Sequence, residues 1–300
     1  MIESRASGTS NVVVPTVHPA RRAFRKAAPL AVSYTVLTIT ALISIIPFLW
    51  MISTSLKSSG AIFTWPPQLF PDPIVWGNYR EVFEQVPFER YFLNTLFYSS
   101  MVVAGQLLFC SLAGYAFARL VFPGRDAIFM LYLGTMMIPA TVTLVPSFIL
   151  MRWFDWVDTI WAMTIPGMFG SAFGTFLMRQ FFLTIPKDLD DAAVIDGASK
   201  WRIFWQIILP HGKPALAVLG VFTITTVWND FMWPLIMLHS RELYTLNLGL
   251  ASFQGGMQSY TFWAGLMAAA TMTVAPLIVI YMFTQRFFTE GISLTGMGGR

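Results

Sequence analysis

The residue whose type and setting most suggest chemistry is Asp230, a carboxylate inside a long apolar run. Trp228 and Asn229 precede it, and Trp233 follows. An acid and an amide can hydrogen-bond ligand hydroxyl groups, and indole rings can stack on the apolar faces of a ligand. A plainer interpretation is also open: the acid holds two helices together, and the tryptophans anchor helix ends at a membrane surface.

Residue types for enzymatic catalysis are scarce. The only cysteine is Cys110, so no disulfide can form within the chain. The sequence has no GxxxxGK[ST] phosphate-binding loop, because Gly212-Lys213 lacks the matching upstream glycine. The three histidines lie in separate regions, at His18, His211 and His239. We therefore predict that the chain is not an enzyme, and we expect no cofactor and no metal site.

Residues 186–213 form a polar segment with a regular pattern. Leu189, Ala192 and Ala193 have helical spacing, and three aspartates near Leu189 suit the positive end of a helix dipole. Gly197 interrupts this pattern, as a residue with positive φ would. The segment therefore begins as a short helix that ends in a glycine bend.

A second helix is predicted after the bend, with Ser199 as its N-cap. Apolar residues then recur at the spacing of one helix face, at Trp201, Phe204, Trp205 and Ile208. The pattern alone allows two interpretations. The hairpin either lies in lipid headgroups as an interfacial anchor, or it docks a partner protein.

The composition indicates that these residues are positioned by membrane helices. Hydrophobic residues make up 56% of the chain and charged residues 11%, about half the usual charged share. A helix needs about 20 apolar residues to cross the hydrocarbon core. Six runs satisfy this and predict spans over 30–53, 92–117, 127–151, 160–178, 214–238 and 261–285. If the fifth helix is continuous from Pro214, Asp230 lies about 24 Å along it, in the outer half of the bilayer.

The distribution of Lys and Arg predicts the orientation of these spans. Fourteen of the 19 Lys and Arg residues fall on the side of the two termini, and five fall on the other side. The positive-inside rule then places both termini and the loop 186–213 in the cytoplasm. The organisation is an N-terminal segment (1–29), one transmembrane domain (30–285) and a cytoplasmic tail (286–300).

The loop 186–213 resembles the EAA loop of permease subunits of bacterial ABC importers. Its signature residues at the family's spacing are Asp191-Ala192-Ala193, then Gly197, Ile207, Leu209 and Pro210. The extended D-G-A form is present as Asp196-Gly197-Ala198. Asp191 replaces the usual glutamate, which keeps the charge and shortens the reach by one methylene.

The likeness extends from about residue 30 to the C-terminus and is greatest to the carbohydrate branch, such as the smaller permease of the maltose system. Five segments carry it: Phe92–Leu96, Ala113–Leu120, Met178–Phe182, Trp228–Leu235 and Gln285–Ile292. The resemblance implies an all-α, type I ABC importer permease fold with coupling helices in the loop. It implies ATPase-coupling roles for Asp191, Ala192, Ala193, Asp196, Gly197, Ala198, Phe204, Ile207, Leu209 and Pro210.

The implied partners are a second homologous permease, two ATP-binding-cassette ATPase subunits and an extracytoplasmic solute-binding protein, which the outward loop 57–91 would help to dock. The implied location is a bacterial or archaeal plasma membrane, and ATP hydrolysis would reside on the partner ATPases. We expect translocation of a sugar or oligosaccharide, with Trp228, Asn229, Asp230 and Trp233 as pathway candidates. The modest net charge of +4 gives no reason to expect a nucleic-acid partner.

Three alternatives stay open. The cargo could be a glycerol-phosphate or a polyol. An ion-coupled secondary transporter would usually show internal repeats and several intramembrane charges, whereas Asp230 is the one acid within these spans. An intramembrane enzyme would need a catalytic constellation, which the sequence does not offer.

Overall fold

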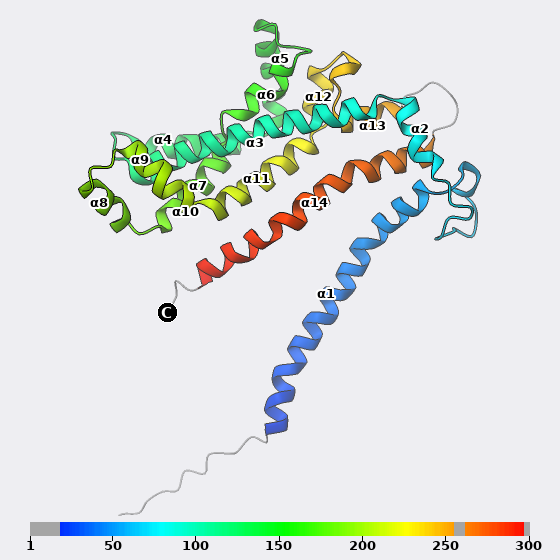
Figure 1. The fold of residues 1–300 in the computed structure, drawn as a ribbon, viewed down its shortest axis with the longest axis horizontal. Helices are drawn as coiled ribbons and strands as arrows, with labels where there is room; N and C mark the ends of the chain where they lie inside the picture. The colour runs from blue at the N-terminus through cyan, green and yellow to red at the C-terminus, as the bar shows by residue number, and fades with distance from the viewer. Residues whose placement is uncertain (1–18, 255–261, 297–300) are drawn as a thin grey trace, which may run out of the picture. The chain divides into compact units, whose positions relative to one another are not determined.

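The computed structural model describes the backbone of residues 19–254 and 262–296, and every element in these ranges is helical (Figure 1). In chain order the α-helices are α1 (Pro19–Ser55), α2 (Gly77–Gln85), α3 (Phe88–Arg119), α4 (Arg125–Gly134), α5 (Ala140–Trp153), α6 (Ile160–Met168), α7 (Ala172–Thr184), α8 (Asp188–Ile195), α9 (Lys200–Ile203), α10 (Leu209–His211), α11 (Lys213–Trp228), α12 (Met232–Met237), α13 (Leu246–Gln254) and α14 (Trp263–Gly296). Short 3-10 or π-helical segments are η1 (Ser59–Ala61), η2 (Thr135–Met137), η3 (Phe204–Ile208) and η4 (Arg241–Leu243). The predicted all-α class is confirmed. Residues 1–18 of the predicted N-terminal segment and 297–300 of the predicted tail lie outside the described residues.

Helix α1, taken by itself, is apolar and exposed from Val32 to Trp50. Its run Val32–Ser55 has a mean hydropathy of 2.2, and large side chains such as Leu37 and Ile43 are more than half exposed. In water such a surface would be a strong association site. In hydrocarbon it matches the lipid, and the helix satisfies its own backbone groups. The helix therefore has the properties of a membrane span.

Three further stretches have the length and composition of spans: Phe88–Arg119, Ile160–Thr184 and Trp263–Gln285. The first of them, α3, contacts α6, α7 and α11. Its approach to α7 depends on Gly114, where a Cβ would lie 2.7 Å from the Cβ of Met178. Small residues allow such close crossings between membrane helices, where van der Waals packing supplies much of the association energy.

The third predicted span, 127–151, is not one straight helix. Helices α4 and α5 are bent by 100° at a short break. Pro139, at this break, lacks a backbone N–H and disfavours helical backbone in the residue before it. Ile138 accordingly has φ −84° and ψ 116°. The described residues contain four helices long and apolar enough to cross a membrane, or up to six when this pair and one other bent pair are each counted as one span.

The fifth predicted span, 214–238, is interrupted as well. Helix α11 ends at Trp228, residues 229–231 are not helical, and α12 follows. With 16 residues, α11 is about 24 Å long, which is less than the roughly 30 Å of hydrocarbon. The prediction of one continuous helix through Asp230 was therefore wrong. Pro234 gives a physical reason, because it has no N–H with which to continue the helical ladder.

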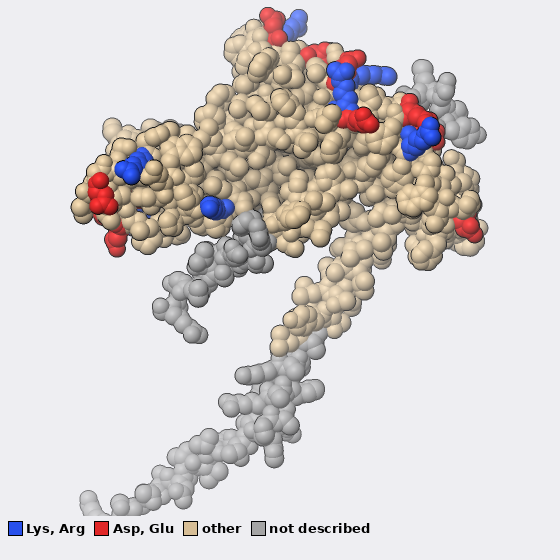
Figure 2. Space-filling view, viewed as in Figure 1, with Lys and Arg blue, Asp and Glu red and all other residues tan. Residues whose placement is uncertain are grey.

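Charged side chains lie mainly toward the ends of the helices. Figure 2 shows them near α8 at one end, and around α2, the tip of α5 and the α12–α13 connection elsewhere, with uncharged surface over α3 between. Beneath that surface, buried apolar clusters hold α3 against α7, η3 and α11, and against α13 and α14. An uncharged surface between charged ends is typical of a bundle that spans a bilayer.

Candidate functional site

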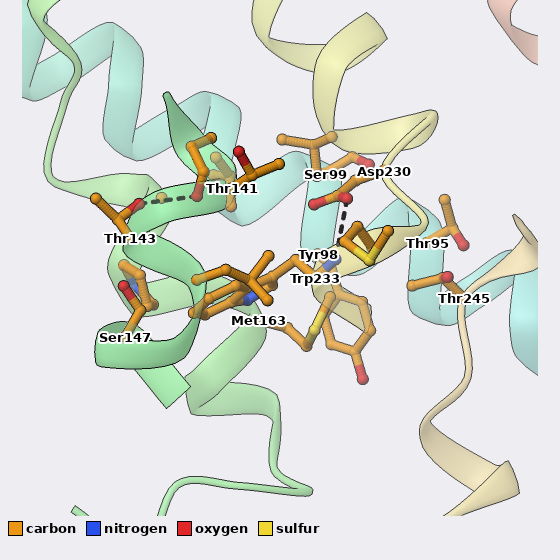
Figure 3. Close-up of a pocket in the computed structure, with 17 residues that line it drawn as sticks. Thr95, Tyr98, Ser99, Thr141, Thr143, Ser147, Met163, Asp230, Trp233 and Thr245 are labelled. Atoms are coloured by element: carbon orange, nitrogen blue, oxygen red, sulfur yellow. Dashed lines mark hydrogen bonds between the residues drawn. The ribbon is translucent and has the colours of Figure 1, made fainter. Parts of the chain in front are cut away.

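A cavity of about 450 Å³ lies among α3, α5, α6 and the α11–α12 connection (Figure 3). This volume is within the roughly 300–1,000 Å³ of small-molecule sites. Apolar side chains make up most of its wall, among them Val102, Met163 and Trp233. Most of the polar residues that line it carry a hydroxyl group, namely Thr95, Tyr98, Ser99, Thr141, Thr143, Ser147 and Thr245, and Asp230 adds a carboxylate. Hydroxyl groups and a carboxylate on an apolar wall suit a ligand that has both hydroxyl groups and apolar faces.

Asp230 enters the cavity from the break between α11 and α12 (Figure 3). One carboxylate oxygen, Oδ1, accepts a hydrogen bond from the Trp233 N–H at 3.3 Å. A carboxylate offers about four lone-pair positions, so capacity remains for a ligand hydroxyl. Non-helical backbone at membrane depth is tolerated where it lines a cavity, and this break does.

Trp233 is the second predicted pathway residue that lines the cavity. Its Nε1 donates a hydrogen bond to the Ala162 carbonyl at 2.9 Å, which joins α12 to α6. The indole ring is therefore held in a fixed orientation at the cavity wall. A fixed aromatic face loses little conformational entropy when a ligand stacks on it.

The other two predicted pathway residues do not line the cavity. Trp228 is 1% exposed, and its Nε1 donates to the Thr273 carbonyl of α14 at 3.1 Å. Asn229 donates from Nδ2 to the Thr225 carbonyl at 2.8 Å, one turn back in α11. The structure thus brings Asp230 and Trp233 together and places Trp228 in the helix-packing core.

The sequence interpretation missed the hydroxyl groups on α3 and α5. The available signal was the i, i+4 spacing of Thr95 with Ser99 and of Thr143 with Ser147 inside apolar runs. That signal is weak, because helical Ser and Thr commonly bond a carbonyl one turn back, as Thr95 does to Tyr91 at 2.9 Å. Ser99 differs: its buried Oγ has no hydrogen-bond partner among the described residues. An unpartnered buried hydroxyl is unfavourable unless a ligand or water satisfies it.

The loop 186–213 has the predicted helix–bend–helix form. Helix α8 begins at Asp188, and Gly197 has φ +76°, a conformation that L-residues rarely adopt. The Ser199 hydroxyl accepts a hydrogen bond from the Arg202 N–H at 3.3 Å and caps α9. The second helix continues through the π-helical η3 into α10.

The apolar side chains of the second helix are only partly buried. Phe204 and Ile208 are buried, but Trp201 is 61% exposed and Trp205 is 40% exposed. The rings of Trp201, Phe204 and Trp205 still contact one another, with centroids 5.1–6.1 Å apart, so these three side chains lie together on one face as predicted. The loop therefore exposes several large apolar side chains: Leu189, Val194, Ile195, Trp201 and Trp205.

The C-terminal part of α3 connects the bundle to both halves of this loop. Arg119 Nε lies 3.3 Å from Asp190 Oδ2 of α8, with side chains 3% and 15% exposed. Arg119 also donates from Nη2 to the Ile185 carbonyl at 2.5 Å. The Tyr115 hydroxyl donates to the Lys200 carbonyl of α9 at 3.2 Å. A displacement of the loop would therefore act directly on α3.

Within the ranges 19–254 and 262–296, no group of three or more His, Cys, Asp or Glu side chains could hold a metal ion.

Comparison with known proteins gives relatives of similar length. The arabinooligosaccharides transport system permease protein AraQ of Halalkalibacterium halodurans is 34% identical over 86% of this chain and 93% of its own length. The diacetylchitobiose uptake system permease protein NgcG of Streptomyces coelicolor is 30% identical over 88% of this chain and 87% of its own length. The sn-glycerol-3-phosphate transport system permease protein UgpE of Pectobacterium atrosepticum is 33% identical over 77% and 84%.

A solved structure has the same fold. A chain of a bacterial ABC transporter involved in the import of the acidic polysaccharide alginate superposes with a TM-score of 0.79 and 26% identity, covering 92% of this chain and all of the other. The predicted resemblance to ABC importer permeases is thus confirmed. Residues 108–293, more than half of the sequence, match the family of binding-protein-dependent transport system inner membrane components, and the chain belongs to that family of transport subunits.

Proposed function

We propose that this chain is one permease subunit of an ATP-driven importer for a sugar or oligosaccharide. Its partners are a second permease, two ATPase subunits and an extracytoplasmic solute-binding protein. The observation that carries this proposal is the loop 186–213, a glycine-bent pair of helices that exposes apolar side chains and is bonded to α3. Those features suit an element that receives a movement and passes it to the bundle.

The exposed side chains of the loop favour a protein partner over a lipid surface. Ile195 is 86% exposed, but α8 also carries the exposed acids Asp188 and Asp191. Anionic side chains are poorly suited to a cytoplasmic leaflet that carries negative surface potential. An apolar centre beside polar residues is instead the usual anatomy of a protein interface. The partner is the ATPase, because this chain has no phosphate-binding loop.

The cavity supports a sugar as cargo. The relatives AraQ and NgcG are named for arabinooligosaccharides and diacetylchitobiose, and a mostly apolar cavity lined also by hydroxyl-bearing residues, Asp230 and Trp233 suits such molecules. The relative UgpE is named for sn-glycerol-3-phosphate, which makes a glycerol-phosphate the second candidate. A phosphate is ordinarily held by Arg, Lys or backbone N–H groups. No Lys or Arg is among the lining residues in the described part of the chain, which favours the sugar.

Transport follows alternating access in this proposal. Closure of the ATPases moves the loop 186–213, and the bonds of Arg119 and Tyr115 transmit that movement to α3. Helix α3 supplies Thr95, Tyr98 and Ser99 to the cavity wall. A shift of α3 therefore changes the cavity and moves the loop in a single step.

Site-specific cross-linking tests the proposed coupling. Ala192→Cys, at an exposed position on α8, is combined with single-cysteine variants of the importer's own ATPase in membrane vesicles. We expect a cross-link that changes in yield between nucleotide-free and ATP-bound states. The native Cys110 is buried, so the parent chain supplies the background.

The matched control is Glu84→Cys on α2, whose side chain is 60% exposed on the side assigned to the exterior. It should give no cross-link to the ATPase. A cross-link from Glu84→Cys, or none from Ala192→Cys in an importer that still transports, would overturn the coupling role.

A further inference from the structure

The connection between α1 and α2 exposes a dense set of large apolar side chains. Within residues 63–76 there are six of them that are more than half exposed: Phe63, Trp65, Leu69, Phe70, Ile74 and Trp76. Between Lys57 and Arg80 the only charged residue is Asp72. Figure 2 shows this region of the surface as almost uncharged. Scattered exposed apolar residues are ordinary, but six within fourteen positions mark a surface that is covered in the functional molecule.

This connection folds back onto the last turn of α1. The Ser53 hydroxyl donates a hydrogen bond to the Leu69 carbonyl, and the Val75 N–H donates to the Leu56 carbonyl at 2.8 Å. Asn78, at the start of α2, donates to the Ser55 carbonyl at 2.8 Å. The residues between these bonds cannot extend far from the end of the helix.

The position of the connection along the membrane normal follows from α1. Because the run Val32–Ser55 has the length and hydropathy of a span, its last residue marks one surface of the bilayer. A contact with α14 places the connection at the same depth in the membrane. The Phe63 ring packs edge-to-face on Trp263 at 5.8 Å, and Trp263 is the first residue of the span in α14. The exposed rings therefore lie where two spans meet the same membrane surface.

Lipid is the covering that fits this chemistry. Tryptophan concentrates at the membrane interface, where its ring meets apolar chains and its N–H meets headgroups and water. Ile52, in the last turn of the span in α1, is 42% exposed as well. A protein interface would carry a polar rim, but here the only charge is Asp72.

We propose that residues 63–76 are an interfacial anchor, which inserts its aromatic side chains at the headgroup–acyl boundary of the leaflet that the C-terminal end of α1 reaches. The anchor fixes the depth of the ends of α1 and α14. In the orientation proposed above this is the outer leaflet, but the insertion itself does not depend on that orientation or on the transport function.

Fluorescence quenching tests the anchor in the full chain. Trp65→Cys and Phe70→Cys, at side chains 89% and 81% exposed, are labelled with an environment-sensitive dye. The labelled chains are reconstituted into vesicles of phosphatidylethanolamine and phosphatidylglycerol. We expect emission shifted to the blue, strong quenching by lipids brominated near the headgroup, and weak quenching by aqueous iodide.

Glu84→Cys on α2 is the control, and it should show the opposite pattern because its side chain is 60% exposed and charged in the native chain. Iodide quenching at Trp65→Cys and Phe70→Cys equal to that at Glu84→Cys would overturn the anchor. So would labels that neither quencher reaches, since they would then be covered by protein. The two positions serve as independent variants if one fails to fold. Because the chain is measured without partners, the result holds even if no cross-link to an ATPase is found.

Discussion

Among single residues that the structure describes, Asp230 is the one charged residue that lines the cavity. It bonds one N–H of the α12 turn. We predict that Asp230→Asn lowers uptake of the transported sugar about tenfold, because a hydrogen bond to a charged group contributes about 1.5–3 kcal/mol. The amount of the variant protein in the membrane should equal that of the wild type, because the substitution removes a charge from an apolar environment.

Uptake of radiolabelled sugar and immunoblots of membranes measure the two effects. Asp72→Asn is the matched control, because it makes the same chemical change at an exposed position outside the cavity. Wild-type uptake by Asp230→Asn would show that the charge has no role in transport and that Asp230 only stabilises the non-helical segment between α11 and α12.

Gly197 is constrained by its backbone and not by its surroundings. Its φ is +76°, and a Cβ would meet no atom within 4 Å. We predict that Gly197→Val abolishes transport, since a non-glycine residue in this region costs about 1–2 kcal/mol and a β-branched one more. The loop would then leave its bent form while the spans stay inserted.

The readout is ATPase activity stimulated by substrate-loaded binding protein, together with membrane abundance. Gly134→Val is the control, since a Cβ there also meets nothing within 4 Å but φ is −56°. The prediction fails if Gly197→Val retains stimulation and uptake at normal abundance.

Asp158, which lies outside the spans, makes the stability of the folded protein depend on pH. Its Oδ1 accepts hydrogen bonds from the N–H groups of His239 at 2.8 Å and Ser240 at 2.9 Å. Burial disfavours the charged carboxylate and by itself would raise the pKa of Asp158. The hydrogen bonds from Ser240 and His239 have the larger combined effect, so the pKa lies below its ordinary value. Because the folded pKa is depressed, the stabilisation is complete above the unfolded pKa of about 3.9 and is lost as pH falls through the folded value.

We therefore predict that Asp158→Asn lowers the thermal unfolding temperature by roughly 2–4 °C near neutral pH. The difference from wild type should be constant from about pH 7 to pH 5 and should shrink only below about pH 4. Thermal unfolding of purified protein across this range measures it. A difference that disappears near pH 6 would point to a histidine instead.

At the scale of elements, the junction of α3 with α8 depends on one buried ion pair, Arg119 with Asp190. Removal of one partner from such a pair leaves an uncompensated charge at a cost of about 3–5 kcal/mol, whereas replacing both by apolar residues is often tolerated. We predict that Arg119→Met impairs stability and coupling, and that adding Asp190→Leu restores part of the stability but not the coupling.

Unfolding temperature and stimulated ATPase activity separate the two outcomes. The exposed pair Arg80–Glu84, with side chains 85% and 60% exposed, is the control and should contribute about 0–1 kcal/mol. Single variants of the Arg119 pair that behave like those of the exposed pair would contradict a role in coupling.

The elements differ in how far the sequence determines them. The bend at Gly197 and the cap at Ser199 were predictable, because each is a local requirement of one residue type. The 100° bend between α4 and α5 was not, because hydropathy reports composition and is the same for straight and bent runs. The break at Asp230 was missed for the same reason, although Pro234 lies just beyond it.

The cavity was only partly predictable. Asp230 was found because an acid in an apolar run is unusual. The hydroxyl groups of Ser99 and Ser147 come from α3 and α5, which are distant in the sequence, and their meeting is a result of tertiary packing. Trp228 was misplaced because a tryptophan beside a candidate site and a tryptophan in a helix-packing core have the same local sequence signal.

At the scale of the whole molecule, the proposed roles of the loop 186–213 and the anchor 63–76 require the two segments to lie on opposite sides of the membrane. If the loop docks an ATPase it must lie in the cytoplasm. The span in α1, Val32–Ser55, follows the predicted cytoplasmic N-terminal segment 1–29 and crosses once, so the anchor at its C-terminal end must lie on the opposite side. The basic residues agree with this arrangement, since fourteen of 19 fall on the side of the loop.

We accordingly predict that Ala192→Cys and Glu84→Cys react from opposite sides of the membrane. In intact cells a membrane-impermeant maleimide should label Glu84→Cys, whereas Ala192→Cys should react only after permeabilisation. Both positions are exposed, so a failure to react reports the barrier and not burial. The parent chain, whose Cys110 is buried, should stay unlabelled in both conditions. Labelling of Ala192→Cys in intact cells would reverse the orientation, and the loop could then no longer be the ATPase-docking element.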